Sequence, residues 1–288
     1  MTVPVEWRCA SCRGRRVRVS ADAIECLACD TRLARLHGVW YGDSEPLPER
    51  FDAAAADRIA ALDEDDHFWV RQRRLLFRRL LDRVVRQRDA VVELGCGSGG
   101  MLPVWEGGFA SVAAVDAYRP LLARAHARGG AATLIQSDVC ATPLADGQFD
   151  MAAAFDVIEH VDPDALLSEA RRLVRPGGQL LVSAPAFRAL WSAMDERAGH
   201  RCRYDSALLG LELRRNGWRY DGHTYFQCLL FPLVYLSRRL AGGTHPVERR
   251  PGRLIDRTLG LINRVEVAAS SRFTVPFGSS IVAWATRT

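Results

Sequence analysis

The sequence predicts an α/β fold in which a mostly parallel, seven-stranded sheet is covered by helices on both faces. Three observations support this prediction. Short apolar runs alternate with helical stretches from residue 89 to the end of the chain. A glycine-rich turn follows the first apolar run, and acidic residues follow the next ones. Two pairs of cysteines near the start of the chain indicate a small metal-binding module, which a helical segment separates from the sheet.

The composition is that of an ordinary soluble globular protein, with 48% hydrophobic and 25% charged residues. The net charge of +5 is too small to indicate a nucleic-acid partner by itself, and the chain uses arginine throughout and no lysine. The start of the chain has no apolar signal-peptide core, and no apolar run reaches the roughly 20 residues of a membrane span. We therefore expect a cytoplasmic protein whose eight cysteines are thiols or metal ligands, not disulfides.

Residues 1–42 are predicted to form the metal-binding module. Cys9 and Cys12 make one C-x-x-C pair, and Cys26 and Cys29 make a second one after a short arginine-rich span. Each pair places two thiolates on one tight turn, so the two turns supply the four soft ligands of a tetrahedral zinc. Four ligands leave no open position for water, and we expect a folding role. Unligated cysteines are the alternative, and a redox pair is disfavoured because no βαβ context surrounds either motif.

Residues 43–88 are predicted to be a linker and two helices. Asp43–Pro48 is polar and contains prolines, Phe51–Leu62 is rich in alanine, and Glu64–Arg88 has helical spacing of its apolar residues. The predicted apolar face of the second helix consists of Phe68, Leu75, Leu76, Leu80, Leu81, Val84 and Val85. The opposite face is lined with arginines, which we interpret as solvated in preference to a phosphate- or membrane-contacting surface.

The region 89–288 alternates strand-like and helix-like stretches. The predicted strands are Ala90–Leu94, Ser111–Val115, Thr133–Ser137, Met151–Phe155, Gln179–Ala184 and Trp218–Phe226. The predicted helices are Met101–Gly107, Arg119–Arg128, Pro163–Val174 and a stretch near Ser206–Asn216. The polar segment Ala241–Pro251 is expected to be a loop.

The glycine-rich turn is the strongest local signal for a ligand. Gly95, Gly97 and Gly99 follow Glu93, a carboxylate at the end of a buried strand. Glycines let the backbone turn sharply and lie against a ligand where a Cβ would clash. Asp116 and Asp138 follow the next two strands, at the edge where such sheets bind ligands. The turn by itself predicts a cofactor that contains adenosine, against the alternatives of a ligand-free turn and of helix-capping aspartates.

The motifs that follow narrow this prediction. The stretch Glu93–Gly99 resembles the first motif of the class I S-adenosylmethionine-dependent methyltransferases, and the resemblance continues in order through Asp116, Asp138, Ile158–Val161 and Arg175–Gly178. It implies a Rossmann-like domain over 89–288 that ends in an antiparallel strand at Ser280–Thr286, with an acceptor-side insertion at about 186–278. It also implies that residues 1–42 are a zinc ribbon of the kind that precedes some bacterial methyltransferases.

The same resemblance assigns the cofactor site. It implies S-adenosylmethionine as the cofactor, held at the ribose by Asp116 and at the adenine by Asp138. The helix that contains His67–Arg73 is similar to one that lies across the cofactor pocket in one subgroup, which makes Trp69, Arg71 and Arg73 candidates to line that pocket. The complete set expected at the cofactor is Glu93, Gly95, Gly97, Gly99, Asp116, Asp138, Val139, Phe155, Trp69 and Arg71. A core position is the alternative for Trp69.

The Ile-Glu-His-Val motif at 158–161 resembles that of quinone-precursor and natural-product O-methyltransferases, which implies an oxygen or nitrogen of a small-molecule or peptide as acceptor. A hydroxyl acceptor needs a base, and His160, His200 and Tyr204 are the titratable candidates. Arg201 and Arg203 are candidates to bind an anionic acceptor.

Three other interpretations stay open. Ribosomal RNA methylation is possible because the arginines at 13, 15, 16 and 18 can follow phosphates, but the sequence lacks the signature of enzymes that methylate exocyclic amines of bases. A non-catalytic scaffold is disfavoured by the intact glycine turn and both aspartates. The apolar stretch Cys228–Leu236 is too short for a membrane span, and can be a pocket wall, a dimer contact or a shallow membrane anchor.

Overall fold

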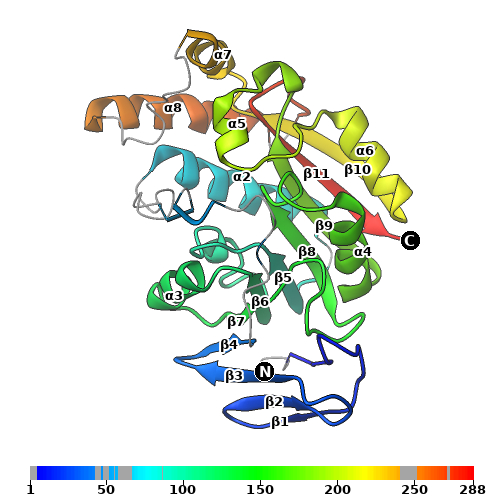
Figure 1. Cartoon of the computed structure of the whole chain (residues 1–288). Helices are drawn as coiled ribbons and strands as arrows, with labels where there is room; N and C mark the ends of the chain where they lie inside the picture. The colour runs from blue at the N-terminus through cyan, green and yellow to red at the C-terminus, as the bar shows by residue number, and fades with distance from the viewer. Residues whose placement is uncertain are drawn as a thin grey trace.

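The predicted α/β fold is confirmed by a computed structural model, which describes residues 5–42, 47, 52–54, 56–57, 67–85, 87–240, 252–270 and 273–288. Seven strands form its central sheet in the order β7-β6-β5-β8-β9-β11-β10 (Figure 1). They are β5 (Ala90–Leu94), β6 (Ser111–Asp116), β7 (Thr133–Gln136), β8 (Phe149–Phe155), β9 (Val174–Pro185), β10 (Trp218–Phe226) and β11 (Ser280–Arg287). The first five strands are parallel, and β11 pairs antiparallel with both β9 and β10.

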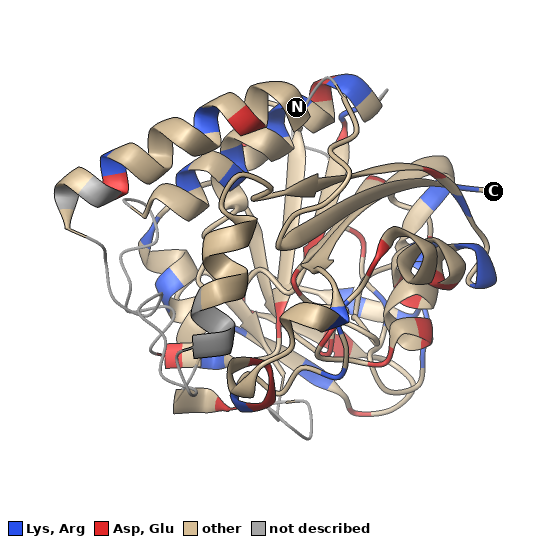
Figure 2. Cartoon of the chain, turned by 90° about the horizontal axis from the view of Figure 1, so that it is seen from above, with Lys and Arg blue, Asp and Glu red and all other residues tan. Residues whose placement is uncertain are grey.

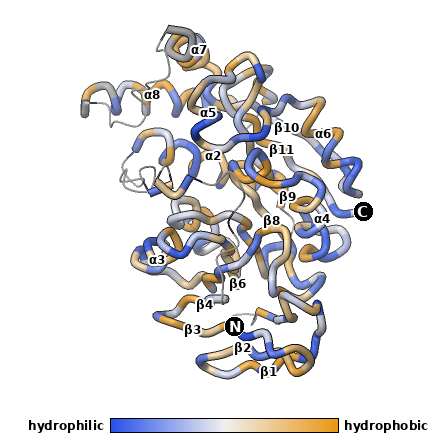
Figure 3. The backbone as a smooth tube through the Cα atoms, in the orientation of Figure 1, coloured by the Kyte–Doolittle hydropathy of each residue, from blue (hydrophilic) through white to orange (hydrophobic). Residues whose placement is uncertain are grey.

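Helices cover both faces of this sheet, as expected from strands that are apolar on both sides. The helices are α2 (Phe68–Val84), α3 (Arg119–Ala127), α4 (Pro163–Leu173), α5 (Ala193–Arg197), α6 (Ser206–Arg215), α7 (Phe231–Leu240) and α8 (Arg253–Ser270). Val92 and Leu94 of β5 belong to the core shared with α4 and α6, whereas Val91 belongs to the core shared with α2 and α3. The strands are largely hydrophobic, and charges of both signs lie on helices and loops (Figures 2 and 3).

The cysteine module contributes four short strands to the same sheet. They are β1 (Val17–Val19), β2 (Ala23–Cys26), β3 (Arg32–Leu36) and β4 (Val39–Tyr41). β4 pairs in parallel with the edge strand β7 and so extends the sheet to eleven strands. A second attachment joins Arg8 to the segment 143–146, where its backbone N–H donates to Pro143 at 2.9 Å and its side chain pairs with Asp146 at 2.7 Å. The module therefore covers an edge that would otherwise expose unpaired backbone groups.

Several predicted boundaries differ from the observed ones. The predicted helix at Met101–Gly107 is only a 3₁₀ turn, Leu102–Val104, because Pro103 and the glycines that follow do not continue an α-helix. Helix α2 is shorter at both ends than the predicted Glu64–Arg88. Helix α8 falls in the region 186–278 and was not predicted. The predicted loop at 241–251 lies outside the described residues, as do most of the predicted linker 43–48 and helix 51–62.

No described helix is both long enough and apolar enough to cross a membrane.

Candidate active site

The glycine turn connects β5 to the 3₁₀ turn at Leu102–Val104, and hydrogen bonds to β6 hold it in place. The backbone N–H groups of Gly95 and Cys96 both donate to the carbonyl of Val115, at 2.8 and 3.0 Å. Gly95, Gly97 and Gly99 all have positive φ, which a side chain makes costly. A Cβ on Gly95 would lie 2.3 Å from Val157, whereas a Cβ on Gly97 would meet only Leu121, at 4.0 Å. Gly97 therefore borders open space of the kind that a ligand fills.

Two aspartates follow the strands next to this turn. Asp116 accepts hydrogen bonds from the backbone N–H of Gly97 at 2.7 Å and of Tyr118 at 2.9 Å, and burial raises the pKa of its carboxyl group. Asp138 accepts one from the N–H of Cys140 at 2.8 Å. Because β5, β6 and β7 are parallel, both carboxylates lie at the same edge of the sheet as the glycine turn. Val139 beside Asp138 is buried.

Glu93 is deeply buried among the expected cofactor residues. It is 1% exposed and accepts a hydrogen bond from the indole Nε1–H of Trp105. Burial raises the pKa of Glu93 to about 8 despite this hydrogen bond and the nearby Arg73. Phe155 stacks against Phe77 of α2, with ring centroids 4.1 Å apart, and also against Trp105. The expected cofactor residues Glu93 and Phe155 thus line the interface between the sheet and α2.

Arg73 corrects the prediction that the arginine face of α2 is solvated. Its side chain is 6% exposed, and Nη1 lies 2.6 Å from Oδ2 of Asp156, just after β8. Its Nη2 donates to Oγ of Ser183 on β9 at 2.7 Å. The guanidinium also lies over the Trp69 ring, 4.4 Å from its centroid. Helical periodicity by itself places Arg73 on the solvated face, whereas the resemblance made it a candidate for the cofactor pocket.

Trp69 and Arg71 were both expected at the cofactor pocket. Trp69 is partly buried beneath the Arg73 guanidinium. The Arg71 side chain pairs with Asp256 of α8 at 2.7 Å, and Asp256 also accepts from the backbone N–H of Phe68. Asp256 therefore joins Arg71 to α8.

On the acceptor side, the structure brings His160 and His200 together although 40 positions separate them. Their rings meet edge to face with centroids 4.8 Å apart. Nδ1 of His200 lies 2.8 Å from Oδ1 of Asp195, a carboxylate that is 1% exposed. Burial and the neighbouring His200 lower the pKa of His160 to about 4. Glu159 completes this cluster: one of its carboxylate oxygens and one ring nitrogen each of His160 and His200 lie within 4.8 Å of one another.

The arginine candidates for the acceptor have different surroundings. Arg203 is buried, and its guanidinium donates to Asp195 at 2.8 Å and to the carbonyl of Ala186 at 3.0 Å. Arg203 was expected to bind an anionic acceptor. Its guanidinium instead holds Asp195 in place, so it is not available to bind an acceptor. Arg201 is exposed, and its backbone N–H donates to the carbonyl of Glu159 at 2.7 Å.

Tyr204 lies in the core. It is 1% exposed, its hydroxyl donates to the backbone carbonyl of Ile158 at 3.4 Å, and burial raises its pKa. A base must reach the proton it removes, so this position disfavours the expected role. Sequence reasoning also missed Asp195, which follows a serine N-cap and has the pattern of an ordinary capping box.

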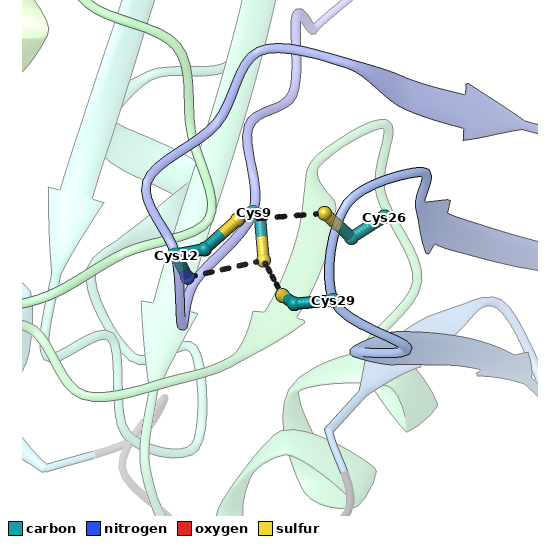
Figure 4. Close-up of side chains that lie close together, drawn as sticks. All are labelled: Cys9, Cys12, Cys26 and Cys29. Atoms are coloured by element: carbon teal, nitrogen blue, oxygen red, sulfur yellow. Dashed lines mark hydrogen bonds between the residues drawn. The ribbon is translucent and has the colours of Figure 1, made fainter.

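The four cysteines of the module converge, as Figure 4 shows. Their sulfur atoms all lie within 4.8 Å of one another, with Cys9 and Cys29 3.4 Å apart and Cys12 and Cys26 3.5 Å apart. The Cys9 sulfur also accepts from the backbone N–H of Cys12.

The arginines of the module are partly neutralised by acids. Arg15 pairs with Asp146 at 3.1 Å, and Arg18 lies 3.7 Å from Glu25. These pairs weaken the case for a phosphate-binding track along the module.

Known proteins share this architecture. A family model described as a methyltransferase domain matches residues 92–182. A malonyl-[acyl-carrier protein] O-methyltransferase of Enterobacter lignolyticus is 31% identical over 237 residues, which cover 74% of this chain and 87% of that protein. A "probable S-adenosylmethionine-dependent methyltransferase" of Mycolicibacterium smegmatis is 31% identical over 48% of this chain and 53% of its own length. The solved structure of a geranyl diphosphate methyltransferase in complex with S-adenosylmethionine has a TM-score of 0.51 at 17% identity, covering 73% of this chain and 83% of that one.

Proposed function

Because the chain belongs to the S-adenosylmethionine-dependent methyltransferases, we propose that it methylates a hydroxyl oxygen of a small-molecule acceptor with His200 as the general base. A relative named as an O-methyltransferase supports oxygen as the acceptor atom. The observation that carries the proposal is the Asp195–His200 pair, which lies beside His160 of the turn that follows β8.

The cofactor would be held by the turn and the two aspartates. Gly97 leaves room for it, and the oxygens of Asp116 and Asp138 suit ribose hydroxyls and an adenine amine. S-adenosylmethionine supplies a methyl group that its sulfonium already activates. The protein therefore has to align the acceptor and, for a hydroxyl, to remove a proton.

His200 suits this proton transfer better than His160. The Asp195 carboxylate holds Nδ1 of His200, which fixes the ring and leaves Nε2 for the acceptor. In hydrolytic triads a carboxylate orients the histidine base in the same way. Arg203 and the N-cap Ser192 in turn fix Asp195. His160 has a pKa of about 4, so at neutral pH it is too weak a base to remove a hydroxyl proton efficiently.

Turnover and cofactor binding, measured separately, test the proposal. His200→Gln should lower turnover of a hydroxyl acceptor such as a catechol by about a hundredfold to ten-thousandfold, with unchanged S-adenosylmethionine affinity. The matched variant His160→Gln should lower turnover less. An ionised carboxylate acceptor, such as a malonyl thioester, needs no base and should be unaffected by either variant. Methylation of a hydroxyl by His200→Gln at the parent rate would contradict the role of His200.

We also propose that Cys9, Cys12, Cys26 and Cys29 bind one structural zinc. Four thiolates at the usual Zn–S distance have sulfurs about 3.8 Å apart, and the separations of 3.4 and 3.5 Å are close to this value. Elemental analysis should find one zinc per chain, lost in Cys26→Ser and retained in the control Cys228→Ser. Zinc-free parent protein, or full zinc in Cys26→Ser, would contradict the assignment.

A further inference from the structure

Most of the exposed large apolar side chains of the described residues belong to a single part of the chain. They lie just before and on α7, on α8 and on the segment between α8 and β11, and Figure 1 shows α7 and α8 at the same end of the molecule. They are Leu229, Leu233, Tyr235, Leu236, Leu254, Leu261, Val265, Phe273 and Phe277, which together we call the apolar end surface. Exposed apolar groups gathered in this way mark interaction sites.

Helix α8 is amphipathic, and its apolar stripe faces solvent. Leu254, Leu261 and Val265 recur at spacings of seven and four, so they share one helix face, and they are 78%, 64% and 63% exposed. A surface helix normally buries such a stripe. This helix instead presents the stripe to solvent, so these three side chains bury little apolar surface in the isolated chain.

The inward face of α8 carries polar groups beside Val267, which is fully buried in the core. Asp256 pairs with Arg71 of α2. Glu266 accepts from the backbone N–H groups of Cys228 and Leu229, at 2.7 and 3.1 Å. Asn263 is fully buried. The contacts of Asp256 and Glu266 attach the helix to the body through polar groups, and so they fix the outward direction of the leucines.

The charge of the apolar end surface is of one sign. Arg257 and Arg264 are exposed beside the leucine stripe, whereas Asp256 and Glu266 face inward. Among the exposed residues that the structure describes between 229 and 277, none is acidic. An apolar stripe flanked by arginines is the pattern of helices that lie in the interface of an anionic membrane.

The apolar end surface also continues into the body. Phe277 packs on Phe231 of α7, with centroids 5.5 Å apart, and Phe231 packs on Phe187 just beyond β9. Phe187 stacks on Tyr225 at 4.9 Å. The surface therefore reaches the carboxyl end of β9, the strand next to β8 and its Glu159–His160 turn.

We propose that α7, α8 and residues 273–277 dock the protein on an anionic lipid surface, with the leucine stripe of α8 in the apolar boundary and its arginines at the headgroups. The short apolar length of these helices places them on the membrane surface and not across it. The inference does not depend on the proposed reaction.

Sedimentation of the full chain with vesicles tests the proposal. The protein should bind vesicles of phosphatidylcholine with about one quarter phosphatidylglycerol, and bind pure phosphatidylcholine much more weakly. Replacing Leu261 and Val265 together by Glu should lower partitioning more than about tenfold. Replacing Arg257 and Arg264 together by Gln should lower partitioning by about twenty-fivefold, since each arginine near the surface contributes about fivefold. Leu211→Glu on α6, a control at a residue 54% exposed, should leave partitioning unchanged.

Circular dichroism and S-adenosylmethionine affinity equal to those of the parent would show that the variants are folded. Failure of the parent to bind anionic vesicles would overturn the proposal. So would binding of both double variants that is as strong as that of the parent. So would a dimer in analytical ultracentrifugation that the α8 variants abolish while vesicle binding is absent, because the occupant would then be a second copy of the chain.

Discussion

The buried ion pair between Arg73 and Asp156 allows the sharpest stability prediction. Arg73→Met keeps much of the side-chain volume between Trp69 and Phe77 but leaves the Asp156 carboxylate without its counter-charge. Breaking a buried pair from one side costs about 3–5 kcal/mol. The Asp156 side chain keeps 26% exposure, so water compensates in part, and we expect about 3 kcal/mol.

A double-mutant cycle separates the ion pair from other losses. Asp156→Asn suits the cycle because Asp156 has a φ of 56°, a left-handed conformation that asparagine also tolerates. In urea denaturation, the double variant Arg73→Met/Asp156→Asn should be less destabilised than the sum of the two single variants by about 2 kcal/mol. Arg79→Met, at an exposed position of the same helix, should change stability by less than about 0.5 kcal/mol. A cost below about 1 kcal/mol for Arg73→Met, or additive single effects, would refute the reasoning.

Two further predictions concern the module and Glu93. Chelation of the proposed zinc should red-shift tryptophan fluorescence, because Trp40 is only 7% exposed and packs against the main core. It should also lower the melting temperature of the whole protein by about 5 °C, because β7 loses its neighbour β4. An unchanged melting temperature would contradict this coupling. Glu93 keeps its proton up to about pH 8 when folded, whereas the unfolded chain releases it near pH 4.3, so stability should fall as pH rises between these values and then level off. In Glu93→Gln, the fall in the free energy of unfolding with rising pH should be smaller by up to about 1.4 kcal/mol per pH unit. If the urea midpoints of the parent and of Glu93→Gln changed with pH in parallel, the assignment would be contradicted.

The parts of the structure that follow from local sequence were predicted well. β5 and β10 have the predicted bounds because apolar strands and their turns are encoded by neighbouring residues. The positions of Asp116 and Asp138 follow from topology, since carboxyl ends of parallel strands meet at one edge. The fold class could be predicted on this basis, and the enzyme class from the resemblance of the ordered motifs to class I methyltransferases.

Contacts between distant segments could not be predicted in this way. The pairing of His200 with Asp195 and the use of Arg203 to hold Asp195 depend on how the loop after β9 folds back. The inward turn of Arg73 depends on Asp156, 83 positions away. Helix α8 was missed because its inward face combines the buried Val267 with polar residues, whereas the search for helices assumes an apolar inward face.

Calorimetry with S-adenosylmethionine tests the central claim most directly, with Gly97→Ala and a nicotinamide dinucleotide as comparisons. The parent should bind S-adenosylmethionine with micromolar affinity and should not bind the dinucleotide. Gly97→Ala should remain folded, because the added methyl meets only Leu121 at 4.0 Å and the strain of the positive φ costs about 1–2 kcal/mol, yet bind at least about tenfold more weakly as the methyl enters the cofactor space. Tight dinucleotide binding by the parent without any S-adenosylmethionine signal would contradict the account.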